Sequence, residues 1–362
     1  MRPRTLILVE LNGGNDGLNT IVPFGDALYR DLRGGLAVPR ERVIPLDENV
    51  GLHEKLAPLT EAWKARDLAI VQGVGYPNTN RSHFRSIEIW DTASAATQTL
   101  GEGWVAQAFR GADLPQGAGV DAIVADNNSL PVTGRSLRTI VMQDAEVFLR
   151  QSQAMKDRPH GHDGGNPALR HVLAVRREVN GAASGLRDRL RDVPPPAFAF
   201  NQDGNLLGRE LDLATRLVLS RLPVIVVKVA LGGFDTHANQ APIHERLLGI
   251  LAGNLATLRR NLIASGQWND VLVLTYSEFG RRVRPNASGG TDHGAAAPLF
   301  VMGGRVAGGL HAAHPSLSDL QDGDLRHAVD FRSVFSAVAR DWWGRQSDFG
   351  LRQPDRLSFI RT

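Results

Sequence analysis

The residues with the plainest chemistry are an aspartate and a histidine two positions apart, Asp235 and His237, which follow the glycine pair Gly232-Gly233. A carboxylate oxygen and an imidazole nitrogen at this spacing are workable ligands for zinc or a similar divalent metal. The two glycines allow a tight turn that would hold both side chains near the end of the preceding apolar run. A capping aspartate beside a surface histidine stays open as the ordinary alternative.

A second acidic and imidazole group lies further along the chain. Glu278 follows one apolar run, and Asp292-His293 comes just before the next. Carboxylate and imidazole groups between two core strands are difficult to explain as solvated surface. We predict Glu278 and His293 as metal ligands, and Asp292 as either a ligand or a partner that orients His293.

Two further segments supply a hydroxyl and another carboxylate. Ser82 stands where an apolar run gives way to helical spacing, so it can begin a helix whose dipole and free N–H groups would stabilise an alkoxide. Arg81 and Arg85 are within reach of an anion bound there, and Asp16 follows the first apolar run. A capping serine and a turn aspartate would explain the same residues without any function.

The sequence gives less support to two alternative functional sites. His160, His162 and Asp163 have side chains that suit a metal, but they lie in a Gly/Pro-rich loop with no strand leading into it. We therefore interpret this cluster as exposed loop. The glycine-rich turn after Leu11 raises a nucleotide-binding oxidoreductase as an alternative, although its spacing is not G-x-G-x-x-G.

Strands alternating with helices must position all these residues. Apolar runs rich in β-branched residues predict strands at Thr5–Leu11, Leu68–Val74, Ala122–Val124, Val224–Leu231, Val271–Tyr276 and Leu299–Met302. Helical spacing predicts helices at His53–Arg66, Ser82–Thr92, Val172–Leu190, Leu206–Arg221, Pro242–Ala264 and Ala328–Trp342. Several strands are apolar on both faces, which favours a three-layer α/β/α sandwich with a central, mostly parallel sheet. Ligands of such sheets bind at the carboxyl ends of the strands, so the polar residues should meet at one rim.

The predicted organisation is a single α/β domain over residues 1–362, with a helical insertion at about 145–220. Lys and Arg number 41 against 38 Asp and Glu, and the two signs are interspersed, whereas nucleic-acid binders concentrate their basic charge. The absence of Cys excludes disulfides and thiolate ligands. No stretch approaches the roughly 20 apolar residues of a membrane span, and the first apolar run is too short for a signal peptide.

Five motifs together resemble one known family. GGNDGLNT, NRSHFRS with IWDT, GGFDTHANQ, YSEFGRR and GGTDHGAAAPLFVMGG occur in this order between about residue 4 and about residue 345. The set is similar to the bacterial family catalogued as domain of unknown function 1501, which is placed in the alkaline phosphatase and sulfatase superfamily. The resemblance implies an alkaline phosphatase-like fold, an alkoxide nucleophile, and one or two divalent ions (Zn, Mn, Ca or Mg).

The resemblance also implies roles for particular residues. Asp235, His237 and His293 resemble the ligands of the first metal, and Asp16 occupies the place of a ligand of the second. Ser82 stands where the superfamily has its Ser, Thr or formylglycine nucleophile.

The sequence departs from the superfamily pattern at the second metal. Glu278 stands where Asp is usual, and Phe279 replaces the expected His. The spacing between Asp235 and His237 is also tighter than the superfamily's. These departures leave open a single-metal centre, a different metal, or a site without hydrolysis.

Two functional hypotheses follow. The first is a metal-dependent hydrolase or transferase that acts on a small anionic phosphate or sulfate ester through Ser82. The second is a non-catalytic exported protein that binds an anionic ligand or a partner protein in the same cleft. The resemblance implies a periplasmic location and a partner protein encoded nearby, while the sequence alone is equally compatible with the cytoplasm.

Overall fold

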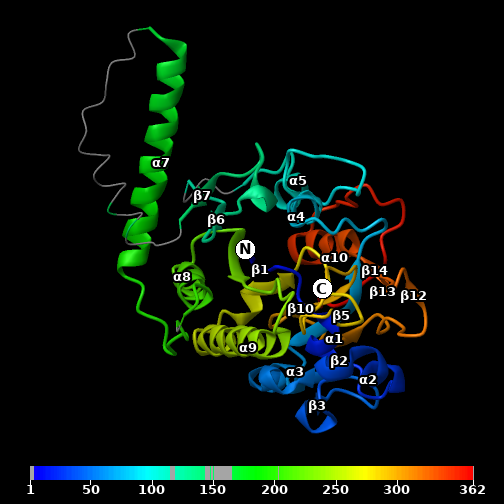
Figure 1. Ribbon diagram of the computed structural model, residues 1–362. Helices are drawn as coiled ribbons and strands as arrows, with labels where there is room; N and C mark the ends of the chain where they lie inside the picture. The colour runs from blue at the N-terminus through cyan, green and yellow to red at the C-terminus, as the bar shows by residue number, and fades with distance from the viewer. Residues whose placement is uncertain are drawn as a thin grey trace.

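The computed structural model describes residues 4–114, 119–142, 147, 150, 165–202 and 204–361, and it is built around a nine-stranded sheet (Figure 1). The strands are β1 (Thr5–Asn12), β5 (Leu68–Gly75), β6 (Ala122–Val124), β7 (Thr139–Val141), β8 (Val226–Gly232), β9 (Val271–Tyr276), β10 (Ala297–Met302), β11 (Gly309–His311) and β14 (Val329–Asp330). Their order is β11-β5-β10-β9-β1-β8-β6-β7, and β14 pairs with the end of β5. Only β10 runs antiparallel to its neighbours in this described sheet.

Helices cover both faces of this sheet, which confirms the predicted α/β fold with a mostly parallel centre. The helices are α1 (Gly17–Thr20), α2 (Ala27–Arg33), α3 (Thr60–Lys64), α4 (His83–Thr92), α5 (Trp104–Ala108), α7 (Pro167–Arg191), α8 (Leu207–Leu219), α9 (Gln240–Ala264) and α10 (Phe331–Ala337). On one face Ile7 and Val9 of β1 share a core with α3, α8, α9 and the end of α7. On the other, Leu6 and Leu8 share a core with α4, α5 and α10. Alternate side chains of one strand therefore serve two cores.

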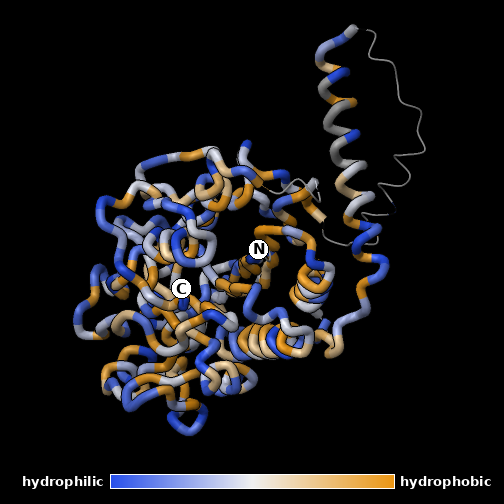
Figure 2. Tube along the Cα trace, turned by 180° about the vertical axis from the view of Figure 1, so that it is seen from behind, coloured by the Kyte–Doolittle hydropathy of each residue, from blue (hydrophilic) through white to orange (hydrophobic). Residues whose placement is uncertain are grey.

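All six predicted strands are present. The strand expected at Val224–Leu231 begins two residues later, at Val226. The short strands β7, β11 and β14, of two or three residues each, were not predicted. Figure 2 shows the hydrophobic residues concentrated along the strands and on α9.

Two predicted helices begin later in the structure than expected, whereas α7 begins earlier, at Pro167. The stretch His53–Arg66 forms the 3₁₀ segment η3 (Glu54–Leu59) before α3, since Pro58 has no N–H to donate within an α-helix. The stretch Ala328–Trp342 begins with β14, and its helix starts only after Asp330, whose carboxylate accepts from the backbone N–H of Arg332 at 3.0 Å. A π-helical turn, η6 (Val338–Trp342), completes it.

The middle of the chain contains α7 and α8, within the stretch predicted as a helical insertion. The α7 helix projects away from the sheet in both views (Figures 1 and 2). Asn166 caps it by accepting from the backbone N–H of Ala168 at 2.9 Å, and Pro167 is its first residue. Residues 157–164, including the rival cluster of His160, His162 and Asp163, lie outside the described residues. The division into domains stays a prediction.

Smaller elements surround the sheet. They are the three-stranded sheet β2 (Ile21–Val22), β4 (Gly51–His53) and β3 (Val43–Pro45), the hairpin β12 (Leu320–Gln321) and β13 (Asp324–Leu325), and the 3₁₀ turns η1 (Gly34–Leu36), η2 (Arg40–Arg42), η4 (Leu130–Val132) and η5 (Trp268–Asp270). Among the helices of the described ranges, none combines the length and apolar character that crossing a membrane requires.

Candidate metal centre at the rim of the sheet

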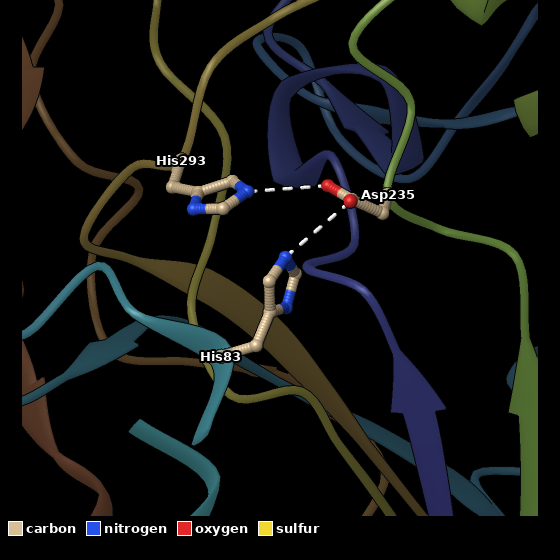
Figure 3. A group of neighbouring side chains, drawn as sticks. All are labelled: His83, Asp235 and His293. Atoms are coloured by element: carbon tan, nitrogen blue, oxygen red, sulfur yellow. Dashed lines mark hydrogen bonds and ion pairs between the residues drawn. The ribbon is translucent and has the colours of Figure 1, made fainter. Parts of the chain in front are cut away.

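The polar loops that follow β5, β8 and β9 meet at one rim of the sheet, together with the segment that enters β10. This follows from the strand directions: β5, β8 and β9 end at this rim, and the antiparallel β10 begins there. His83, Asp235 and His293 come from three of these segments and face one another (Figure 3). One ligand atom of each lies within 4.8 Å of the others.

Asp235 is the centre of this group. Its Oδ1 lies 3.1 Å from Nε2 of His293 and 3.0 Å from Nε2 of His237. Its Oδ2 lies 3.4 Å from Nε2 of His83. The Nε2 atoms of His237 and His293 are 2.9 Å apart, so His237 adds a third imidazole to the cluster. The structure thus brings together the predicted ligands Asp235, His237 and His293.

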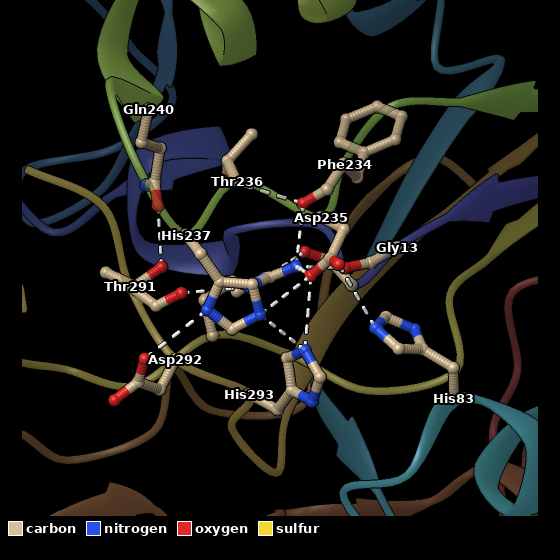
Figure 4. A network of polar contacts seen from close by, with 12 residues as sticks. Gly13, His83, Phe234, Asp235, Thr236, His237, Gln240, Thr291, Asp292 and His293 are labelled. Atoms are coloured by element: carbon tan, nitrogen blue, oxygen red, sulfur yellow. Dashed lines mark hydrogen bonds and ion pairs between the residues drawn. The ribbon is translucent and has the colours of Figure 1, made fainter. Parts of the chain in front are cut away.

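The outer nitrogen of each imidazole has an acceptor of its own. Nδ1 of His293 lies 2.7 Å from the carbonyl oxygen of Arg81, and a carbonyl can only accept, so this nitrogen carries the proton. Nδ1 of His83 is held in the same way by the Glu278 carboxylate at 2.9 Å. Nδ1 of His237 faces Oδ1 of Asp292 at 3.4 Å (Figure 4). These outer partners direct the lone pair of each Nε2 inward.

Inward lone pairs and a carboxylate this close repel one another unless a proton or a cation lies between them. Zinc with ligand bonds of about 2.0–2.1 Å and tetrahedral angles would hold its ligand atoms roughly 3.3 Å apart. The Nε2–Oδ separations of 3.0, 3.1 and 3.4 Å are close to that value. The side chains of His83, Asp235 and His293 therefore fit a divalent ion, and His237 lies beside them.

The charges of the cluster are set by fixed neighbours. Burial alone would raise the pKa of Asp235, but its neighbours, led by the hydrogen bond from Arg281, lower it to about 2. The hydrogen bond to Glu278 raises the pKa of His83, whereas burial lowers the pKa of His293. Asp235 is thus a carboxylate at any physiological pH.

Arg281 joins the loops around the cluster. The side chain is fully buried, and its guanidinium donates to Oδ1 of Asp235 at 2.7 Å. It also donates to the carbonyl oxygens of Gly14 at 2.8 Å, Phe234 at 2.9 Å and Thr291 at 2.9 Å, and to that of Gly13. One side chain therefore fixes the loops after β1 and β8 and the segment before β10.

Phe279 occupies the position where the family resemblance led us to expect a histidine. Its ring stacks on His293, with centroids 4.3 Å apart and planes at 25°, and lies 4.9 Å from the ring of His83. Glu278, beside it, is buried and accepts from the backbone N–H of Gly13 at 2.8 Å in addition to His83. Glu278 thus contacts the cluster through His83.

Asp16 does not reach the imidazole cluster directly. Its buried carboxylate accepts from Arg33 and Gln240, and from the backbone N–H of Asn19 at 3.2 Å at the start of α1. Burial raises the pKa of Asp16, but the Arg33 guanidinium outweighs it and the net pKa is lowered. Gln240 continues the connection by accepting from the Thr291 hydroxyl at 2.6 Å. Arg33 supplies the positive charge beside this carboxylate.

Ser82 lies at the N-terminus of α4, between two residues that contact the cluster. It precedes His83 and follows Arg81, whose carbonyl holds His293. The Ser82 side chain is exposed and makes no capping hydrogen bond. The Arg81 guanidinium binds Asp324 at 2.9 Å.

Arg85 points away from the cluster. Its guanidinium pairs with Glu88 at 2.8 Å and donates to the carbonyl oxygens of Ala96 at 3.2 Å and Gln98 at 2.6 Å.

His83 is the member of the cluster that the sequence reasoning missed. The prediction for this segment rested on the hydroxyl of Ser82 and the flanking arginines, and it did not include the imidazole of His83. The signal was available, since His83 follows the end of a buried strand by the same rule that selected Asp235 and His293.

Comparison with known proteins places the chain in a family. Residues 48–335 match the family described as "Protein of unknown function (DUF1501)". The chain belongs to this family. The match confirms the resemblance drawn from the five motifs, and it covers most of the sheet and all the residues of the cluster. No curated protein matches this member of the DUF1501 family.

Several solved structures share similarity with this DUF1501 protein. The C-terminal periplasmic domain of EcEptC from Escherichia coli has a TM-score of 0.42 and 12% identity, with 96% of this chain and 84% of that chain covered. The phosphonate monoester hydrolase SpPMH from Silicibacter pomeroyi has a TM-score of 0.44 and 11% identity, covering 95% and 74%. The soluble domain of lipooligosaccharide phosphoethanolamine transferase A from Neisseria meningitidis has a TM-score of 0.37 and 11% identity, covering 83% and 77%.

Proposed function

We propose that this protein is a metal-dependent hydrolase or transferase of small phosphate or sulfate esters, with Ser82 as the nucleophile. The observation that supports it best is the set of three imidazoles around Asp235, each with its outer nitrogen held by another acceptor. Histidines that bind metals usually have such an outer partner. Histidines placed only for packing have no need to direct three lone pairs at one carboxylate.

The ion that fits best is zinc or a similar transition metal. Imidazole nitrogens suit such ions, whereas Ca²⁺ and Mg²⁺ prefer oxygen ligands. His83, Asp235 and His293 would hold it, and His237, 3.0 Å from Asp235, lies close enough to join them. When bound, the ion supplies positive charge that polarises the ester and favours the alkoxide form of a nearby hydroxyl.

In this proposal Ser82 attacks an anionic ester bound at the rim. The first turn of α4 leaves backbone N–H groups without partners within the helix, and Ser82 supplies no capping hydrogen bond to them. These groups and the positive end of the helix dipole favour both the Ser82 alkoxide and the non-bridging oxygens of the ester. Attack by Oγ forms a serine ester as the bond to the leaving oxygen breaks, and that oxygen takes up the proton given up by Ser82 and leaves as the alcohol. Water, or a second alcohol, then accepts the group and restores the hydroxyl.

Metal content and turnover of paired variants test the proposal. Purified protein should contain about one equivalent of metal by elemental analysis, and it should hydrolyse an aryl phosphate or an aryl sulfate. Ser82→Ala should keep the metal and lose turnover, and His83→Ala should lose both. Ser265→Ala, at the far end of α9, is the matched control that should change neither.

The results that would contradict the proposal are equally specific. Protein without metal whose turnover is unchanged in Ser82→Ala would refute it. Metal and anion binding without turnover of any ester would instead support a non-catalytic protein that uses the same cleft. A periplasmic location and a partner protein encoded nearby remain predictions from the family resemblance, which cell fractionation and co-purification would test.

A further inference from the structure

A second polar site lies further along the same rim, in a cavity of about 390 Å³ at the carboxyl ends of β1, β6 and β8. The helices α8 and α9 close its sides. Its polar lining includes Asn12, Asp126, Asn205, Glu210 and Arg246. The volume falls within the range of small-molecule sites, about 300–1,000 Å³. None of the imidazole ligands lines this cavity, so it is separate from the metal centre.

Glu210 is the buried polar group directed into the cavity. Only 3% of the residue is exposed, and one carboxyl oxygen accepts from the backbone N–H of Ala230 at 2.8 Å. The other oxygen has no hydrogen-bond partner within the described ranges. This oxygen is therefore free to accept from a ligand hydroxyl. Arg246, which is exposed, makes no ion pair with a described residue and lines the cavity from α9 with further donors.

The wall beneath Asp126 is a buried network of ion pairs and hydrogen bonds. The buried ammonium of Lys228 lies 2.6 Å from Glu10 and also contacts Asp126. Asn128 donates to Asp91 at 2.7 Å behind them. Burial raises the pKa of Glu10 and, further, that of Asp91. The ammonium of Lys228 thus lies between two carboxyl groups, those of Glu10 and Asp126.

We propose that this cavity binds an uncharged polyhydroxylated ligand, a sugar or a polyol. Its side chains are amides, carboxyls and a guanidinium, which together offer both donors and acceptors to hydroxyl groups. No aromatic side chain is among the described residues that line it, so a nucleobase would find no stacking partner. Because the ammonium of Lys228 is already paired with Glu10 and Asp126, it is not free to attract a phosphate. This binding site goes beyond the ester chemistry and does not depend on it.

Calorimetric titration of the purified full chain tests the proposal. The neutral probes are D-glucose, myo-inositol and glycerol, and the charged probes are inorganic phosphate and putrescine. At least one neutral probe should bind with a millimolar or lower Kd, and Glu210→Gln should weaken it about tenfold. Arg246→Ala should also weaken it, whereas Arg209→Ala, an exposed arginine on α8 that does not line the cavity, should leave it unchanged.

The outcomes separate cleanly. Failure of all three neutral probes overturns the proposal, and so does binding that neither Glu210→Gln nor Arg246→Ala weakens. Preference for phosphate or putrescine over the neutral probes also overturns it, because it would mean a charged ligand. Should Glu210→Gln fold poorly, Arg246→Ala still decides the question, since its side chain is exposed. Loss of the metal by His83→Ala should not affect this binding, so failure here is distinguishable from failure of the proposed esterase chemistry.

Discussion

Replacing Glu210 by glutamine should remove a measurable dependence of stability on pH. Burial raises the pKa of Glu210 from its ordinary value of 4.5 to about 7 in the folded protein. Between these two values the folded state holds a proton that the unfolded state has lost. Stability therefore falls as the pH rises through this window. Above the window, burial of the ionised carboxylate lowers the free energy of unfolding by the full amount.

The size of the effect follows from the shift. Each pKa unit corresponds to about 1.36 kcal/mol, so the 2.5 units between 4.5 and about 7 correspond to about 3 kcal/mol. At about 2.1 cal/mol/K of unfolding entropy per residue, a chain of 362 residues changes its Tm by roughly 1 °C for 0.8 kcal/mol. Most of the shift develops between about pH 5 and about pH 8, and it should reach about 3 °C.

The assay is a comparison of melting temperatures across pH for the wild type and Glu210→Gln, with a chelator present so that metal binding does not contribute. Glutamine can still accept from the backbone N–H of Ala230, so the shape and this hydrogen bond are kept. The Tm of the variant relative to that of the wild type should rise by about 3 °C from about pH 5 to about pH 8. If the curves of Tm against pH were parallel for the two proteins, the pKa of Glu210 would be the same in the folded and unfolded states. That result would refute the reasoning.

Three further changes have defined expectations. Glu278→Gln should weaken zinc binding about 10–100-fold in a chelator competition, because it removes the carboxylate that holds Nδ1 of His83. Arg33→Met should destabilise by about 3–5 kcal/mol, read as a Tm about 4–6 °C lower, because it leaves the Asp16 carboxylate buried without its cation. Gly280→Ala should lower both the Tm and zinc affinity, since the new Cβ would clash with the backbone of Ala296.

Each of these changes has a matched control. Glu61→Gln removes an exposed carboxylate on α3, and Arg30→Met removes an exposed guanidinium on the same helix as Arg33. Gly249→Ala adds a methyl group on α9 where nothing lies within 4 Å. Zinc affinity and Tm should change little in these controls. Equal effects in a variant and its control would show that the named contacts do not cause the change.

Much of the fold could be predicted from local sequence. The central strands were found because parallel strands buried on both faces are continuous apolar runs, which few other segments resemble. The direction of β10 could not be found in this way, because a buried strand has the same composition whether it runs parallel or antiparallel. Direction depends on the connection from β9, whose loop returns the chain without a crossover helix.

The site was partly predictable for a related reason. Asp235, His237 and His293 could be selected because each lies next to a strand end, and strand ends meet at one rim. The sequence could not show that Asp16 is paired with Arg33, because only the packing of α2 brings these two residues together. Local sequence shows which groups reach the rim, whereas long-range packing decides which of them remain available to a ligand.

The buried guanidinium of Arg281 has a consequence for how an ion would be exchanged. Because it already fastens the carbonyl groups of four loop residues, the surrounding scaffold does not need an ion to assemble. Little ordering entropy is then left to oppose ion uptake. Stripping the ion should therefore be fully reversible: chelated protein should keep its circular dichroism spectrum and regain its activity on re-addition of zinc without a refolding step.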